Sequence, residues 1–596
     1  MMLLSERLGA PVRKSIRFNS SIILATVLFL TSCASPQVTQ EPISPQSETT
    51  QPETSNDTVQ EFRGNTILFY NGQIITMNDA QPLAEAVLIE GDTIRAVGNE
   101  PDVMAQAGPG TVKIDLQGKT LMPGFVDAHT HLLNDASHFG TDLDGIQQLA
   151  LENGITTIGN MYSPPDFLET MRNYEAENKL RIRTSLYLNH NTNCGDIVGD
   201  WWKDISPTRV PGEMLRIGGV KVFADGGSCK RPALSYETSP GSGYGDLFLT
   251  SDQIAAVVSE AQSAGHQVAI HALGDRAIEA ALDGIESALG GGPNTYRHRI
   301  EHNAILRPDL LPRYGELDIV ATIFGTFPSC ISFENPSPPP YNEWEWAWDT
   351  LVDANPGLHI AWHGDDPYIK PVSPVLELYG MVTRNYADDD RTTVCEGKDW
   401  IIDNKLSVEQ ALPMMTRESA YALFRDDEVG TIEIGKYADL IILSENPLAI
   451  DPELLRNTYV LMTMVGGNVE WCAPGSETLC PAASTPFGYL DNPSEGQTIF
   501  GTINVFGWAL DDSGPIDRVE IYLDGEYIGN AVYGDPRPDV ANDYPGRDNE
   551  PDFGYSFQLD TTHYENGPHT LYAIAFGVSG NQGNLFPETL SVTISN

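Results

Sequence analysis

Basic side chains are scarce in this sequence. Its 596 residues include 35 lysines and arginines against 82 aspartates and glutamates, a formal net charge of -47. Such an excess of acid repels a phosphate backbone and an anionic membrane surface alike, so we expect no nucleic-acid partner. The same acidity suits a protein secreted into salty surroundings or one that binds Ca²⁺ at its surface, and composition does not separate the two.

The sequence also has no pair of cysteines at the Cys-x-x-Cys spacing of many structural zinc sites. Of its seven cysteines, Cys33 stands apart near the N-terminus and the rest are spread from Cys194 to Cys480. In an exported protein such cysteines form disulfides, and Cys472 with Cys480 would close a short loop. The spacing leaves the other pairings open.

The apolar run near the N-terminus, Ile22 to Leu30, is too short to span a bilayer comfortably. It follows a basic start and precedes Leu30-Thr31-Ser32-Cys33, which resembles a bacterial lipobox and implies cleavage before Cys33 and acylation of its thiol. An ordinary signal peptide with an incidental cysteine is the alternative. We therefore expect a lipoprotein signal peptide at 1–33, a disordered tether at 34–63, and an exported protein anchored by lipid to the outer membrane or the cell surface.

The middle of the chain alternates buried-strand patterns with helical patterns. Helical apolar spacing occurs in Ser251 to Gly265 and in Asp275 to Leu289. The expected strands are Phe125 to His129, Ile155 to Asn160, Ile182 to Leu188, Val220 to Ala224, Gln267 to Ile270, Arg299 to His302, Ile319 to Ile323 and His359 to His363. Eight strands with intervening helices favour a (β/α)₈ TIM barrel over an open doubly wound sheet, and we place this barrel at 124–425.

Short β segments with hairpin turns flank the barrel on both sides. We expect 64–123 and 426–471 to pair into one composite β-sandwich, with β patterns over Gly430 to Leu443 and Val460 to Trp471. After a linker at 472–486, residues 487–596 alternate apolar and polar side chains between frequent turns, which predicts an all-β, Ig-like sandwich. This last part contains no candidate catalytic cluster, so a binding or spacer role is expected for it.

Two imidazoles meet at the end of the first barrel strand. Alternate side chains of a strand share a face, so His129 and His131 point the same way, and such a pair suits a divalent transition metal. Because the chemistry of these barrels lies at the C-terminal ends of the strands, groups at other strand ends should converge on this pair. The candidates are Lys221 in the fourth strand, His271 and His302 at the ends of the fifth and sixth, and Asp365 after the eighth.

Together these segments resemble the amidohydrolase superfamily, specifically the amidohydrolase family 3 branch that includes N-substituted formamide deformylase-like enzymes. The resemblance runs from about Thr66 to Trp471. It rests on the motifs PGFVDAHTH, KVFADGG, HALGDRA, RIEH, GDDP and GKYADLIIL followed by VGGNV. It implies that one or two metal ions, expected to be Zn²⁺, are surrounded by His129, His131, Lys221, His271, His302 and Asp365.

The expected reaction is hydrolysis of a non-peptide C–N bond, in an amide or cyclic amide of small size, by a metal-activated water. Zn²⁺ held by neutral imidazoles lowers the pKa of such a water towards neutrality. Asp365 is the expected catalytic base, which returns the proton to the leaving nitrogen. A neutral Lys221 can react with CO₂ to give a carbamate that bridges two ions; alternatively it stays unmodified and one metal binds.

Several alternatives stay open. The same site would suit deamination or ring opening, and an inactive surface binding protein would use the acidic C-terminal sandwich instead. Asp275 and Arg276 either face substrate or brace their loop through an ion pair. Trp344, Trp346 and Trp348 form either an aromatic substrate wall or the apolar packing of a loop against the barrel.

Three features depart from the pattern of the relatives. Their strand-eight motif usually reads Gly-Ser-Asp-Ala-Pro, whereas His363 to Pro367 offers two adjacent carboxylates and an extra imidazole, and we choose Asp365 by register. After strand seven, relatives commonly have Gln-Pro and a nearby His, where this chain has Thr326 to Cys330. The segment between strands one and four is also short. These departures bear on the substrate more than on catalysis.

Overall fold

The computed structural model describes residues 66–108, 111–325, 337–368, 372–397, 401, 403–480, 486–511, 516–544, 551–577, 582–587 and 589–596. The expected signal peptide and tether lie outside these residues, as does the segment Thr326 to Cys330. Among the described helices, none combines the length and the apolar character needed to cross a membrane.

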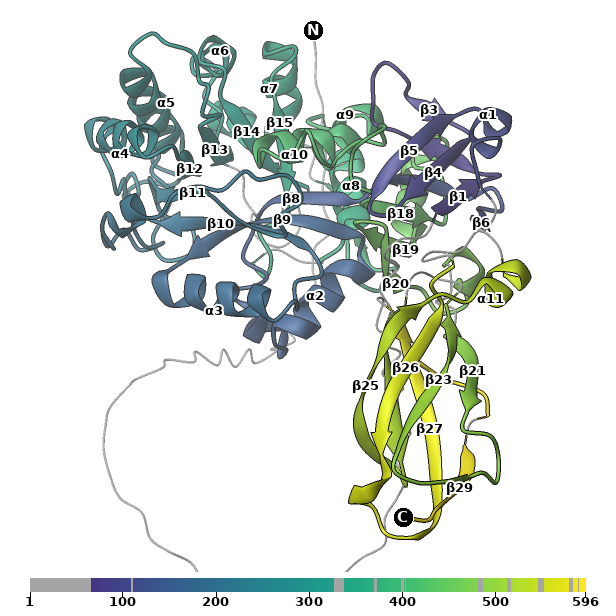
Figure 1. The fold of residues 1–596 in the computed structure, drawn as a ribbon. Helices are drawn as coiled ribbons and strands as arrows, with labels where there is room; N and C mark the ends of the chain where they lie inside the picture. The colour runs from purple at the N-terminus through teal and green to yellow at the C-terminus, as the bar shows by residue number, and fades with distance from the viewer. Residues whose placement is uncertain are drawn as a thin grey trace, which may run out of the picture. The chain divides into compact units, whose positions relative to one another are not determined.

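Eight parallel strands follow one another around a barrel in chain order (Figure 1). They are β8 (Phe125–Thr130), β9 (Ile155–Ser163), β10 (Arg183–Asn189), β11 (Leu215–Phe223), β12 (Gln267–Ala272), β13 (Arg299–His302), β14 (Val320–Phe324) and β15 (Ile360–His363). The last strand lies beside the first, and the backbone N–H of Asp365 donates to the carbonyl of His129 at 3.1 Å. The predicted (β/α)₈ barrel is therefore confirmed.

The largest difference from the predicted strands concerns β11, which begins at Leu215 rather than at Val220. Gly218 and Gly219 interrupt the apolar pattern, but they do not end the strand. A Cβ on Gly219 would lie 2.4 Å from a backbone oxygen and 3.1 Å from the ring of Tyr187. The glycines thus let a buried tyrosine pack against the backbone of the next strand.

Helices connect and cover the strands of the barrel. They are α2 (Leu143–Glu152), α3 (Pro165–Ala176), α4 (Ser251–Ser263), α5 (Asp275–Leu289), α6 (Leu311–Glu316), α7 (Trp348–Ala354), α8 (Pro374–Thr383), α9 (Val408–Met414) and α10 (Arg417–Ala422). Thr250 and Gln253 form a capping box at the start of α4. Helix α5 ends at Gly290, whose φ of 56° is the left-handed conformation that glycine tolerates at a C-terminus. Both helical segments predicted from apolar spacing are therefore present.

Segments from both flanks of the barrel build two further sheets. One contains β1 (Thr66–Tyr70), β4 (Ala86–Glu90), β5 (Thr93–Gly98) and β6 (Val112–Asp115), with α1 (Glu100–Met104) beside it. The other contains β2 (Gln73–Ile75), β3 (Leu83–Ala84), β7 (Thr120–Pro123), β18 (Leu440–Leu443), β19 (Val460–Val465) and β20 (Asn468–Cys472). One apolar cluster contains side chains of both sheets, and β7 pairs antiparallel with β18. The composite β-sandwich is thus formed as predicted.

Of the β pattern expected over Gly430 to Leu443, only the last four residues form a strand, β18. Gly430 and Gly435 have φ angles of 87° and 91°, so the chain turns twice. Ile432 is nevertheless buried in the sandwich. Ile432 is therefore apolar because it is a buried residue of a turn, not because it belongs to a strand. A short antiparallel pair, β16 (Tyr386–Ala387) with β17 (Val394–Cys395), lies between α8 and α9.

The C-terminal part is all-β apart from short helical turns, as predicted. Its strands are β21 (Phe487–Asn492), β22 (Thr498–Ile499), β23 (Thr502–Leu510), β24 (Ile516–Leu523), β25 (Glu526–Asp535), β26 (Gly554–Asp560), β27 (Gly567–Gly577), β28 (Gln582–Asn584) and β29 (Leu590–Ile594), with α11 (Pro538–Asp543) after β25. Alternate residues of β24 and β27 contribute to one buried core. Between the two sandwiches, Cys472 and Cys480 form the disulfide expected from their spacing.

Candidate metal centre

His129 and His131 lie where the chain leaves β8 at the mouth of the barrel. His129 is fully buried and His131 nearly so. The backbone N–H of His131 donates to the carbonyl of Asp366 at 2.8 Å, next to the bond between Asp365 and His129. The ends of the first and last strands are therefore fixed to each other at the point where the histidines stand.

The Nε2 atom of His129 is the meeting point of the predicted residues. It lies 3.3 Å from Oδ1 of Asp365 and 3.3 Å from Nζ of Lys221. The same carboxylate oxygen lies 3.5 Å from Nε2 of His131. Four of the six residues chosen from the sequence thus surround one small volume.

His271 and His302 complete the predicted group. Their ring centroids lie 4.4 Å apart, and the ring of His302 lies 4.7 Å from that of His129. The structure therefore brings all six predicted residues together, from β8, β11, β12, β13 and the loop after β15.

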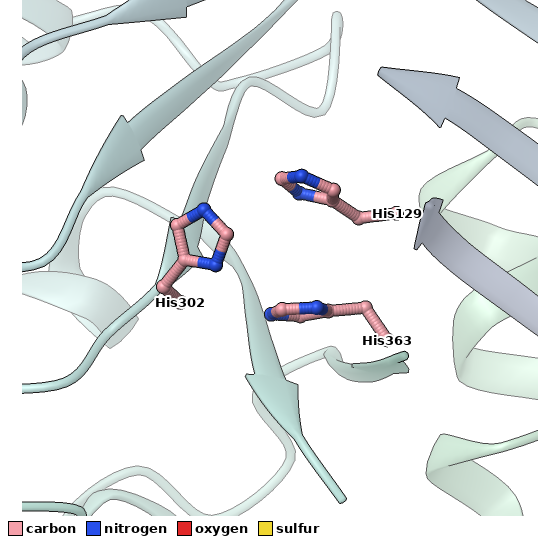
Figure 2. A group of neighbouring side chains, drawn as sticks. All are labelled: His129, His302 and His363. Carbon is pink, nitrogen blue, oxygen red and sulfur yellow. The ribbon is translucent and has the colours of Figure 1, made fainter. Parts of the chain in front are cut away.

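His363, the extra imidazole of the strand-eight motif, lies in the same cluster although we gave it no role. Its ring stacks on that of His129, with centroids 4.9 Å apart and planes inclined by 23°. His129, His302 and His363 each offer a nitrogen, and these three atoms lie within 4.8 Å of one another. Figure 2 shows the three rings pointing toward one another.

The backbone leaves regular strand geometry at two of these positions. His302 has a φ of 76° and Asp365 a φ of 55°, values that residues with a side chain rarely adopt. Successive side chains of a strand point to opposite faces, so the turn at His302 lets it join the site although the preceding Glu301 also points into the barrel. Such conformations cost energy and cluster where function requires them.

Glu301 holds His129 from behind and was not selected from the sequence. Its Oε2 lies 2.7 Å from Nδ1 of His129. Arg299 donates to both of its oxygens at 2.6 and 2.8 Å, and the Thr322 hydroxyl donates at 2.9 Å. Burial alone would raise the pKa of Glu301, but Arg299 and His129 hold it well below its usual value. A carboxylate only accepts, so Nδ1–H of His129 is the donor and Nε2 keeps its lone pair for the site.

The protonation states of the site suit a divalent cation. Burial lowers the pKa of His131, that of His271 to about 3, and that of His302 well below its usual value. Burial alone would raise the pKa of Asp365, but contacts with His129 and His131 hold it well below the usual range. Neutral imidazoles beside an ionised carboxylate are the ligands that Zn²⁺ and similar ions take.

Lys221 is fully buried in β11. Burial lowers its pKa to about 8. Besides its contact with His129, its ammonium nitrogen lies 5.0 Å from the centre of the Phe223 ring. A lysine with so low a pKa is partly neutral near pH 7.5, which is the form able to react with CO₂.

Two further buried carboxylates brace the site. Oδ1 of Asp127 accepts from the backbone N–H groups of His129 and Gly364, each at 3.1 Å, and so ties β8 to the loop after β15. Asp225 accepts from three N–H groups in the loops after β11 and β12, at 2.8 to 3.0 Å. Burial raises the pKa of Asp127 to about 8 and that of Asp225 to about 7.

A cavity of about 740 Å³ opens over these residues. His131, His271, His302 and Asp365 reach it from the barrel. Most of its remaining wall is aromatic or aliphatic and includes Tyr162, Phe223, Leu234, Tyr236, Leu273, Ile305, Phe324, Trp346 and Tyr368. Asn134, Asn193 and Arg231 add polar groups.

The structure answers the question that the sequence left open about Asp275 and Arg276. Asp275 is buried, accepts from the Ser235 N–H at 2.8 Å and lies 3.4 Å from Arg307, so it braces its loop through a partner other than Arg276. Neither Asp275 nor Arg276 is among the described residues that line the cavity.

The three tryptophans do not form one wall. Trp346 lines the cavity. Trp348 is fully buried in the core of the barrel, and Trp344 packs against Tyr341 with ring centroids 4.9 Å apart. Only one of the three is therefore placed to meet a substrate.

A disulfide lies beside the cavity. Cys194 in the loop after β10 is bonded to Cys229 in the loop after β11. The residues next to them, Asn193 and Ser228, line the cavity. This bridge, which the spacing of the cysteines left open, joins two loops of the cavity wall.

Comparison with known proteins agrees with this geometry. Residues 145–469 match the model of the Amidohydrolase family, and residues 486–573 match that of the Bacterial Ig domain. The chain is 29% identical to Protein LONG AFTER FAR-RED 3 of Arabidopsis thaliana over 53% of this chain and 55% of that protein. It is 28% identical to Putative amidohydrolase YtcJ of Bacillus subtilis over 50% of this chain and 54% of that protein. The chain thus spans about half the length of these relatives.

A shorter match, 39% identical over 66 residues, is to N-substituted formamide deformylase of Arthrobacter pascens and covers 11% of this chain and 12% of that protein. Among solved structures, an uncharacterized metal-dependent hydrolase from Pyrococcus horikoshii has the same fold, with a TM-score of 0.55 and 19% identity over 65% of this chain and 99% of that chain. The family model covers more than half of the sequence and the fold agrees with it. This chain belongs to the amidohydrolase family and carries a bacterial Ig domain after its barrel.

Proposed function

We propose that this protein is a metal-dependent hydrolase that cleaves the C–N bond of an amide or cyclic amide other than a peptide. The observation that carries the proposal is the meeting of imidazole, lysine and carboxylate groups from β8, β11, β12, β13 and the loop after β15 beside His129. A divalent cation held there supplies a Lewis acid that polarises a carbonyl and lowers the pKa of water. The residues that would hold it are His129, His131, Lys221, His271, His302 and Asp365.

Asp365 is the proposed catalytic base. Its side chain is 16% exposed and reaches the cavity, whereas His129 behind it is buried. As an ionised carboxylate it accepts the proton of the water that attacks the carbonyl. It then delivers that proton to the nitrogen that leaves, so the amine departs neutral and the carboxylate is regenerated.

Lys221 is proposed to react with CO₂. Its neutral amine forms an N–C bond to carbon dioxide and releases one proton, which leaves an anionic carbamate. The buried amine has a lowered pKa and lies next to Nε2 of His129. A carbamate there would attract the cation, whereas an ammonium group would repel it.

The cavity supports a substrate with an apolar or aromatic substituent. Its wall is largely aromatic, and a volume of about 740 Å³ holds a molecule of moderate size. The name of the Arthrobacter relative, N-substituted formamide deformylase, supports amide cleavage as the reaction.

The test is to assay the purified protein, with its metal content measured by mass spectrometry, against a library of N-aryl and N-alkyl amides and cyclic amides. Release of an amine or opening of the ring is expected, while release of ammonia alone would identify a deaminase. Asp365→Asn should lower kcat by at least about 10²-fold and leave substrate binding intact. Asp275→Asn, a buried aspartate outside the cavity, is the matched control. A folded protein that binds no metal and converts no member of the library would overturn the proposal.

A further inference from the structure

His302 and His363 differ from the other buried histidines of the described chain. Both ring nitrogens of each are shielded from solvent and have no hydrogen-bond partner among the described residues. His298 and His266, buried elsewhere in the barrel, each use one nitrogen to bond a backbone group, at 3.0 and 2.7 Å. His266 and His298 thus each have a hydrogen-bond partner, whereas His302 and His363 have none among the described residues.

A buried polar atom in a native protein is as a rule hydrogen-bonded or bound to an ion or a water. His302 was chosen from the sequence as a metal ligand, which accounts for one of its nitrogens. No such role has been given to His363, whose ring is equally buried. Its nitrogens need a partner, and the side chains of the described residues do not supply one.

The geometry around His363 indicates which partner this is. Its ring centroid lies 4.9 Å from that of His129 and 4.9 Å from that of His302. On another side it meets the ring of Phe324, with centroids 4.3 Å apart. The Phe324 ring has no polar atom that could hydrogen-bond to it, so of the three rings that meet His363 only the two imidazoles offer nitrogen atoms.

The three rings can share one ion. Nδ1 of His129 is engaged by Glu301, which leaves its Nε2 for the cluster. One nitrogen from each of His129, His302 and His363 lies within 4.8 Å of the other two, and the rings point toward one another (Figure 2). Three neutral imidazoles form a common ligand set for a catalytic transition-metal ion.

We propose that His363 is a ligand of the metal in this site, together with His129 and His302. This inference rests on the proposed function, because it takes the metal as given and adds a residue to its ligand set. An added imidazole shifts the preference of the site towards Zn²⁺, Co²⁺ and Ni²⁺ and away from Mg²⁺ and Mn²⁺.

The direct test is a crystal structure of the full-length protein loaded with Zn²⁺, with anomalous data collected at the zinc edge. A peak about 2.0–2.1 Å from a ring nitrogen of His363 is expected. Peaks that lie beyond bonding distance from His363 but on the other predicted ligands would overturn this inference and leave the proposed function standing. A protein that binds no divalent cation would overturn both.

Variants give a second readout that does not depend on activity. His363→Gln should weaken Zn²⁺ binding, measured by competition with a coloured chelator, by at least about 100-fold, more than the loss of a group that only supports a ligand. His298→Gln, which removes a buried imidazole far from the site, should keep the affinity within a factor of about 3. The visible spectrum of the Co²⁺-loaded protein should change only in the first variant. Equal Zn²⁺ affinities and equal Co²⁺ spectra in the two variants would overturn the proposal, and if His363→Gln does not fold, the anomalous map decides.

Discussion

Nδ1 of His129 lies 2.7 Å from Oε2 of Glu301, and both side chains are fully buried. This bond fixes the tautomer of the imidazole and the direction in which Nε2 points. Arg299 in turn holds the carboxylate through two hydrogen bonds. The orientation of the first predicted metal ligand is therefore set by an ion pair inside the barrel, 172 residues away along the chain.

Replacing Glu301 with glutamine should weaken binding of the divalent cation by about 10- to 100-fold, because the amide does not hold the imidazole as a carboxylate does. Affinity measured by chelator competition checks this. Glu279→Gln, which alters an exposed partner of Arg307, is the control and should change nothing. Unchanged affinity in the Glu301 variant would mean that the bond does not position His129.

Replacing Lys221 with alanine should remove most activity, and short carboxylic acids such as acetate or propionate should restore part of it. The acid would occupy the space of the proposed carbamate and supply its negative charge. Assays with and without added acid, at constant pH, make the test. Lys203→Ala, at a half-buried lysine outside the site that pairs with Asp200 and Glu260, is the control. Full activity of the Lys221 variant without any acid would exclude the carbamate.

The barrel should lose stability on acidification, in part through His298. Burial lowers the pKa of this imidazole from 6.5 to about 3. Below pH 6.5, His298 therefore binds a proton in the unfolded chain but stays neutral in the folded protein. The free energy of unfolding falls as the pH falls. Between pH 6.5 and 5 this single group accounts for about 1.5 kcal/mol.

The measurement is thermal unfolding of wild type and His298→Asn over that range. The variant should show the shallower dependence on pH, whatever its stability at pH 7. Identical slopes would show that folding does not lower the pKa of His298.

Replacing Cys194 and Cys229 with serine should destabilise the protein by about 3 kcal/mol, since their bridge closes a loop with a sequence separation of 35. Because the bridge joins two loops of the cavity wall, KM should rise more than kcat falls. The pair Cys472 and Cys480, with a separation of 8, is the control: its loss should cost stability and leave KM unchanged. An unaltered KM in the first variant would show that the bridge does not shape the cavity.

Export and lipid anchoring are proposals that rest on the first 33 residues of the sequence. Expression of the whole chain in a bacterial host with a radiolabelled fatty acid should label the wild type and fractionate it with membranes. Cys33→Ser should abolish both. A labelled or membrane-bound variant would point to a different anchor.

Much of the barrel could be predicted because its strands are buried on both faces and read as continuous apolar runs. The site residues could be found because His271, His302 and Asp365 interrupt those runs where a parallel strand ends. The role of Glu301 could not be predicted, because the motif Arg299 to His302 shows only two charges inside a strand. The folded structure shows that these two charges pair with each other next to His129.

Other features depend on contacts that no local pattern contains. The role of His363 depends on two rings from other strands. The sequence from Gly430 resembles a strand. In the structure, the N–H of Ile432 donates to the carbonyl of Thr76, and Ile432 is a buried residue of a turn rather than part of a strand. Local hydrophobic spacing predicts burial in such cases without predicting the partner.

The pairing of β7 with β18 sets an order of events during synthesis. In the sandwich Leu121 is paired with Ile442, and the whole barrel lies between these two residues in the chain. The sheet containing β7 therefore keeps an open edge until the last barrel segment has been made, and contacts of such long range form late. A chain that stops short of β18 carries an exposed, apolar strand edge, which is a template for pairing with another chain. The sandwich thus makes completion of the barrel a condition for hiding that edge.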